Sequence, residues 1–243
     1  MNKFVALFVG VLLATTARGA RAKAAYQTPQ VMIANSQAIA LVQIDRIEAT
    51  QTKGENWTYG QKATAHVERT LKGQLPATLT LLGDENFICA RCHFETGRFL
   101  VFLKREKADW AGVNYQPSAR KVEEEQVNWS NTDPFADRLV ALSSALDSIT
   151  AIVKSQKQAP RYSMSSATKD EARIWTITEE AKSDDSRALK QPELENWLCT
   201  LTPGTKLSLC NSCLGGNASP EEVQTLRSLA YGLGIEFVVI PAG

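Results

Sequence analysis

The chain has 243 residues, of which 27 are basic and 26 acidic, and its formal net charge is +1. This length accommodates one large domain or two small ones, each with its own core. The balanced charge argues against a nucleic-acid-binding protein, because neutralising phosphates requires a basic surface.

The N-terminus predicts an export signal over residues 1–24. A short basic start, MNK, precedes the apolar stretch FVALFVGVLLA, which is too short to span a bilayer comfortably. A small-x-small pattern ending at Ala24 predicts cleavage before Ala25, with a second possible site ending at Ala22 and an uncleaved anchor as the alternative. Cleavage removes four basic residues and no acid, which leaves 23 basic and 26 acidic residues. We therefore expect a periplasmic or secreted protein without a stable membrane span.

Residues 25–130 predict a small β-barrel or sandwich, because short strands alternate there with turn signals. In the first expected strand, the alternation of apolar and polar residues slips at Arg46, as it does at a β-bulge. The fourth contains an apolar run from Phe99 to Leu103, which predicts burial on both faces. The expected strands are AIALVQIDRIEA (38–49), WTYGQKATAHVERTLKG (57–73), ATLTLLG (77–83) and GRFLVFLKR (97–105), followed by a hairpin within 112–129.

Residues 131–156 predict an amphipathic helix that packs on this first domain, with Asp133 as the N-cap and Pro134 at its first position. The polar segment 157–171 predicts a linker. The apolar stripe of the helix repeats at intervals of three and four residues: Phe135, Leu139, Leu142, Leu146, Ile149 and Val153.

Residues 172–243 predict a small α/β domain in the order β-α-β-α-β. Its clearest helix begins with Ser219 as the N-cap, Pro220 at the first position and Glu222 completing a capping box. The last strand, IEFVVIP, is nearly all apolar, which is typical of the middle of a covered sheet. The other elements are the strands RIWTIT (173–178) and TKLSLC (205–210) and the helix QPELENWLCTL (191–201).

Two family resemblances accompany these patterns. Residues 26–128 resemble the netrin-like, tissue-inhibitor-of-metalloproteinases-like domain of bacterial exported proteins, an OB-fold barrel. The resemblance rests on AIALVQIDRIE, on AHVERTLKG with ATLTLL after a turn, and on CHFETGRFLVFL. It implies binding through one sheet face and its flanking loops. Animal inhibitors of this family grip a protease's metal through a cysteine at the mature N-terminus; the first cysteine here is Cys89, so the resemblance does not imply inhibition by that route.

Residues 172–243 are similar to the periplasmic domain of the ExbD/TolR class of energy-transducing proteins. The similarity rests on RIWTIT, ELENWL and SPEEVQTLRSLAYGLGIEFVVIP. Proteins of that class pair and bind partners through this sheet. Their transmembrane helix with its buried aspartate has no counterpart here, so proton-driven energy transduction is not implied.

The cysteines allow several chemistries. In an oxidising compartment we expect structural disulfides, with at least one of the five thiols free or paired to another chain. We expect a bridge between Cys89 and Cys92 and another from Cys199 to either Cys210 or Cys213. One alternative is a c-type haem electron carrier, in which Cys89 and Cys92 hold the haem and His93 is its axial ligand.

Two further alternatives use both C-x-x-C pairs. One is thiol–disulfide exchange. The other is a zinc site shared by the two pairs, with His93 or His66 as a possible ligand. We expect no cofactor and no metal, and we interpret His66 as a surface histidine on a strand.

The sequence shows no nucleophilic triad, phosphate loop or H-E-x-x-H helix. We therefore predict an exported, non-enzymatic protein-binding protein, of an interaction or inhibitor-like kind, with an unidentified protein partner and no nucleic acid. The expected contact surfaces are the loop around residues 84–97 and the strand edge at 235–240. Trp57 and Trp129, which are flanked by polar residues, are candidates for exposed binding aromatics.

Overall fold

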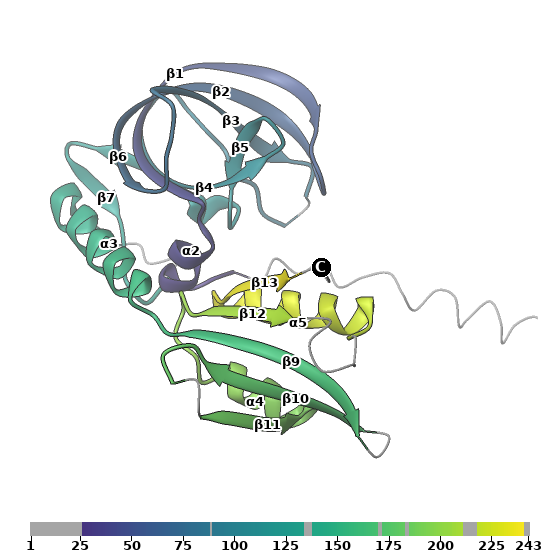
Figure 1. The fold of residues 1–243 in the computed structure, drawn as a ribbon. Coiled ribbons are helices and arrows are strands. Elements are labelled where there is room, and N and C mark those ends of the chain that lie inside the picture. Colours follow the sequence, from purple (N-terminus) through teal and green to yellow (C-terminus); the bar gives the residue numbers. More distant parts are fainter. Residues whose placement is uncertain are drawn as a thin grey trace, which may run out of the picture.

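The protein was analysed as a computed structural model that describes residues 26–87, 89–133, 138–169, 172–182, 185–210 and 218–240. These residues form an eight-stranded mixed sheet, a five-stranded mixed sheet and four α-helices (Figure 1). The predicted signal segment, residues 1–24, lies outside the described residues. In the part of the chain that is described, no helix has the length and apolar character needed to cross a membrane.

The eight-stranded sheet is partly closed into a ring. Its strand order is β1-β2-β3-β5-β4-β6-β7-β8, and β1 also pairs with β4. The pairing of β3 with β5 is parallel, and the other pairings in the ring are antiparallel. The strands are β1 (Ala38–Lys53), β2 (Thr58–Lys72), β3 (Thr78–Glu85), β4 (Gly97–Glu106), β5 (Asp109–Gly112), β6 (Ala119–Glu123), β7 (Gln126–Asn128) and β8 (Leu139–Ala141).

Two hydrophobic cores lie on opposite faces of β1 and β4. Phe99, Val101 and Leu103 belong to one core, whereas Leu100 and Phe102 belong to the other. The predicted burial of this strand on both faces is therefore confirmed, because all five residues are at most 4 % exposed. The predicted bulge in β1 is also confirmed, since its register with β2 shifts between Ile44 and Arg46.

The second of these cores is covered by α2 (Pro29–Asn35) and α3 (Leu142–Lys157). The predicted helix over 131–156 begins later than expected, since α3 starts at Leu142. Leu139, which was expected on its apolar stripe, lies in β8 and is 64 % exposed. The rest of the predicted stripe is correct: Leu142, Leu146, Ile149 and Val153 are all buried. Of the other predicted positions, Phe135 and Pro134 lie outside the described residues.

The five-stranded sheet has the order β11-β10-β9-β12-β13 (Figure 1). One of its faces packs on α4 and α5 in a third core. The predicted capping box at Ser219 and Glu222 is present, and Gly234 ends α5 in a left-handed conformation. The elements are β9 (Arg161–Lys169), β10 (Ala172–Glu179), β11 (Ser186–Lys190), α4 (Gln191–Leu198), β12 (Lys206–Cys210), α5 (Pro220–Leu233) and β13 (Glu236–Ile240).

Two predictions for this region are wrong, and one strand was missed. The expected linker 157–171 contains β9, which lies in the middle of the sheet, and β11 was not expected at all. Serines and threonines occupy four of the nine positions of β9, so its inward residues Tyr162 and Met164 give too weak an alternation to mark a strand. The apolar strand at 235–240 is an edge strand and not a central one.

Direct contacts join the two sheet-bearing units near α2, which lies between them in Figure 1. Asn35 Nδ2 donates to the carbonyl oxygen of Tyr231 at 2.8 Å. The Tyr231 hydroxyl donates to the carbonyl oxygen of Val113 at 3.2 Å. Helix α5 is thus bonded through the backbone and the side chain of one tyrosine to α2 and to the segment that follows β5.

Candidate functional site

The first predicted contact surface is the loop between β3 and β4, which carries the C-x-x-C-H sequence. Its backbone is fixed at three points. Asp84 N–H donates to the Cys92 carbonyl at 2.7 Å, and Cys92 N–H donates to Glu85 Oε2 at 2.7 Å. The Gln61 side chain forms a pair of 2.8 Å hydrogen bonds with the backbone of Phe94. These bonds give the loop one defined conformation.

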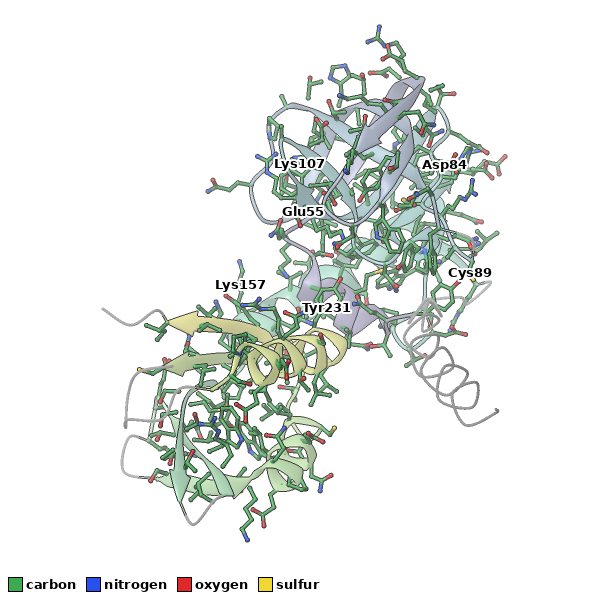
Figure 2. The ribbon with its side chains drawn as sticks, turned by 90° about the vertical axis from the view of Figure 1, so that its right-hand side faces the viewer. Glu55, Asp84, Cys89, Lys107, Lys157 and Tyr231 are labelled. Carbon is green, nitrogen blue, oxygen red and sulfur yellow. The ribbon has the colours of Figure 1, made fainter. Side chains whose placement is uncertain are left out.

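Side chains of this loop alternate between the core and the solvent. Cys92 and Phe94 are buried in the core inside the ring. Cys89, Arg91, His93 and Glu95 are exposed, and Arg91 Nη1 lies 3.2 Å from Asp84 Oδ1. The loop therefore presents a preorganised polar surface that contains both signs of charge; Figure 2 labels Asp84 and Cys89 there.

The expected disulfides involving Cys89, Cys92 and Cys199 are not formed, because all three are free thiols. Cys92 is 0 % exposed and Cys89 is exposed, so the two side chains lie on opposite sides of the loop backbone. A bridge requires the two Cβ atoms to face each other at about 3.8 Å. Cys210 is disulfide-bonded, and Cys213 lies outside the described residues.

The burial of Cys92 also bears on the haem and redox alternatives. A thioether tether needs both sulfurs at a surface that faces the macrocycle, whereas Cys92 is buried and His93 points to solvent. Burial raises the pKa of the Cys92 thiol well above its usual value. The thiol therefore stays protonated and unreactive, unlike a redox cysteine. Among the described residues, no group of three or more metal-binding side chains comes together.

Thiol reactivity provides a direct prediction from this geometry. In the native protein, iodoacetamide should modify Cys89 and Cys199 at the rate of exposed thiols, whereas Cys92 should react only after unfolding. Peptide mass mapping after timed alkylation, with and without urea, measures this. Equal labelling of Cys89 and Cys92 under native conditions would contradict the buried position of Cys92.

The second predicted contact surface is β13, whose one partner strand in the described part of the chain is β12. Glu236 N–H donates toward this partner, to the carbonyl of Thr205 at 2.9 Å. Because backbone groups alternate in direction along a strand, those of Phe237 and Val239 point to the outer edge. Val238 and Ile240 are 46 % and 47 % exposed on the sheet face opposite the helices.

Sequence reasoning missed a hydrogen-bonded row across β1, β2 and β3. His66 Nε2 lies 2.9 Å from Asp45 Oδ2, and His66 Nδ1 lies 3.0 Å from the Thr78 hydroxyl. The pairing of the three strands brings these residues together. All three are exposed, so water competes for each bond, and the interpretation of His66 as a surface residue is confirmed. We therefore assign this row no catalytic role.

The candidate binding aromatics lie in different surroundings. Trp129 is 4 % exposed and stacks on Phe102, with the ring centroids 5.6 Å apart, so the prediction that it is exposed is wrong. Trp57 is only partly buried and contacts Phe87 and Tyr115. Trp57 therefore remains available to a ligand.

Comparison with known proteins identifies no family. No family model matches the chain, and no curated protein is significantly similar to it. A structural search aligns it with a crystal structure of Pelota from Archaeoglobus fulgidus at a TM-score of 0.20 and 6% sequence identity. That alignment covers 88% of this chain and 53% of the Pelota chain, so this chain spans about half the length of that protein. A TM-score this low supports no conclusion about fold or function.

Proposed function

We propose that this is an exported, non-enzymatic protein that binds a protein partner in the periplasm or outside the cell. In this proposal residues 25–130 are an OB-like, netrin-like barrel, and residues 172–243 are a separate small α/β domain. The ring order β1-β2-β3-β5-β4 with its parallel β3–β5 pair supports the first assignment. The observation that carries the function is the outer edge of β13, which pairs with no further strand among the described residues.

An unpaired strand edge offers backbone donors and acceptors to an incoming strand. Many proteins protect such an edge with lysine, proline or a covering element. The strand EFVVI contains no lysine or proline, and two of its apolar side chains, Val238 and Ile240, are nearly half exposed. An extended segment of the partner would add to the sheet here and cover these two side chains.

The loop between β3 and β4 is the second proposed contact. Its backbone bonds to Gln61 and Glu85 hold it in place before any partner arrives, so binding would lose little loop entropy. Arg91, His93 and Glu95 would supply polar contacts at the rim of the interface, where charge affects the association rate and specificity more than affinity.

The experiment uses a partner that is cross-linked to the protein in exporting cells, identified and purified. Val238→Lys should weaken its affinity at least tenfold, because the new charge would lie against the apolar side chains of the added strand. Leu139→Lys is the matched control. It places the same charge on an exposed apolar residue of an edge strand in the other sheet, and should leave affinity unchanged.

Charge reversal at the loop, Arg91→Glu, tests the second contact in the same assay. We expect a slower association rate and a smaller loss of affinity than with Val238→Lys. If neither substitution changes affinity for the partner, both proposed surfaces are wrong and the protein-binding proposal loses its structural basis.

A further inference from the structure

A cleft of about 660 Å³ lies between the eight-stranded sheet and α5. Figure 2 shows Glu55 on the first unit and Tyr231 on α5, at the two sides of this junction. The volume falls within the range of about 300–1,000 Å³ that is usual for small-molecule sites. The cleft is separate from the outer edge of β13, so it represents a function beyond the proposed partner binding. The aromatic and amide side chains that line it include Gln27, Trp57, Asn114, Tyr115, Gln224 and Tyr231.

One wall of the cleft is aromatic and rigid. Tyr115 stacks on Phe87, with centroids 5.2 Å apart and planes inclined at 18°. Trp57 contacts the same Phe87 at 5.1 Å. Phe87 is 6 % exposed and supports the two outer rings from behind. Tyr115 has a positive φ of 49°, a conformation that is costly for a bulky residue and that concentrates at ligand-binding positions.

A buried amide in the cleft has an unused hydrogen-bonding atom. Gln27 is 8 % exposed, and its Oε1 accepts no hydrogen bond in the described part of the chain. Its side chain does bond the Tyr231 hydroxyl, so the amide is held in place beside the cleft. A buried acceptor without a donor costs free energy. A hydroxyl donor on a ligand that reaches Oε1 would remove this cost.

The remaining polar groups indicate an uncharged ligand. Two carboxylates, Glu55 and Glu85, are matched by two cations, Lys104 and Arg227. A strongly anionic or cationic ligand would meet a like charge as well as an opposite one. The exposed amide of Gln224 offers both donors and an acceptor, whereas Asn114 is 2 % exposed and its Nδ2 already donates to the Gln27 carbonyl oxygen at 3.4 Å. An amide that both donates and accepts matches a ligand group, such as a hydroxyl, that does the same.

These features match the chemistry of a sugar ring. A pyranose has an apolar C–H face, which packs on an aromatic ring, and hydroxyls that each donate and accept hydrogen bonds. The wall of Trp57 and Tyr115 would take the face, and the amides would take the hydroxyls. We propose that the cleft between the eight-stranded sheet and α5 binds an uncharged saccharide of one or two rings.

The test titrates the whole exported chain with neutral sugars: glucose, galactose, N-acetylglucosamine, maltose, lactose and chitobiose. Calorimetry measures affinity, and saturation-transfer NMR shows which sugar protons contact the protein. At least one sugar should bind saturably. Trp57→Ala should weaken it at least tenfold, because the stacking face is lost.

Gln224→Ala gives a second variant that cannot disturb the core, because Gln224 is exposed on α5. It should weaken binding severalfold, and Gln126→Ala, an exposed glutamine of β7 away from the cleft, should not. The proposal is overturned if no sugar binds. It is also overturned if sugar binding is unchanged in Trp57→Ala and Gln224→Ala, or if a charged sugar or a peptide binds more tightly at these residues.

Discussion

Replacing Trp175 with alanine should selectively destabilise the five-stranded sheet. Trp175 is 0 % exposed and is the largest of the fully buried side chains. It belongs to the core between the sheet and α4, and its indole N–H donates to Gln191 Oε1 at 2.9 Å, at the first residue of that helix. Truncating a buried tryptophan costs about 3–5 kcal/mol, a large part of the stability of a small domain.

Native-state hydrogen exchange read by mass spectrometry measures the effect in each sheet separately. We expect amide protection to fall about a hundredfold or more in β9–β13, since each 1.4 kcal/mol is a factor of about ten. Trp129→Ala is the reciprocal control, because it removes a ring stacked on Phe102 in the other unit. Equal loss of protection in both sheets for both variants would show one cooperative unit and would contradict the division into two domains.

Local rules predicted the elements whose residues satisfy them without help from distant parts of the chain. Helix α5 is the clearest case, since its N-cap, its proline and its C-terminal glycine lie in the helix or next to it. The strand at 99–103 was predicted equally well, because its apolar run is continuous. Strand β9 was missed because its place in the sheet is secured by neighbours on both sides, β10 and β12, and not by its own apolar residues.

The cysteine loop shows where spacing alone misleads. Cys89, Cys92 and His93 have the spacing of a haem tether, but the side chain at 92 faces the core because Gln61 and Glu85 fix the backbone on either side of it. Gln61 lies in β2, and Glu85 is the last residue of β3. The sequence indicates that Cys92 could be a haem ligand, and only the tertiary structure shows that its side chain packs in the hydrophobic core.

The cleft could not be predicted from the sequence because no motif in one segment defines it. Its walls come from the segment before α2, the turn after β1, the loop after β5 and the exposed face of α5. Trp57 was the only one of its residues with a sequence signal, an aromatic residue among polar neighbours. The meeting of these segments depends on the contacts of Tyr231 with Asn35 and Val113.

Replacing Glu106 with alanine should destabilise the first unit and loosen the aromatic wall of the cleft. The Glu106 carboxylate is 3 % exposed; it accepts Glu55 N–H at 2.6 Å and the Tyr59 hydroxyl at 2.9 Å. It thereby ties the turn before Trp57 to the end of β4. Each donor left without an acceptor costs about 1–3 kcal/mol, so we expect urea denaturation to show a loss of about 3 kcal/mol in total.

A double-mutant cycle with Tyr59→Phe separates the tyrosine bond from the turn bond. Burial, followed by the hydrogen bond to Glu106, raises the pKa of Tyr59 above its usual value, so the hydroxyl remains a donor at neutral pH. Both substitutions remove the same hydrogen bond. The losses of unfolding free energy in the two single variants should therefore add up to about 0.5–3 kcal/mol more than the loss in the double variant. Additive effects would mean that Glu106 acts through Glu55 alone.

A loss of unfolding free energy below about 1 kcal/mol for Glu106→Ala would mean that neither donor depends on this carboxylate, since even one buried donor left without an acceptor costs about that much. A change in tryptophan fluorescence of folded Glu106→Ala that disappears when Trp57 is also replaced by phenylalanine would connect this buried carboxylate to the shape of the cleft.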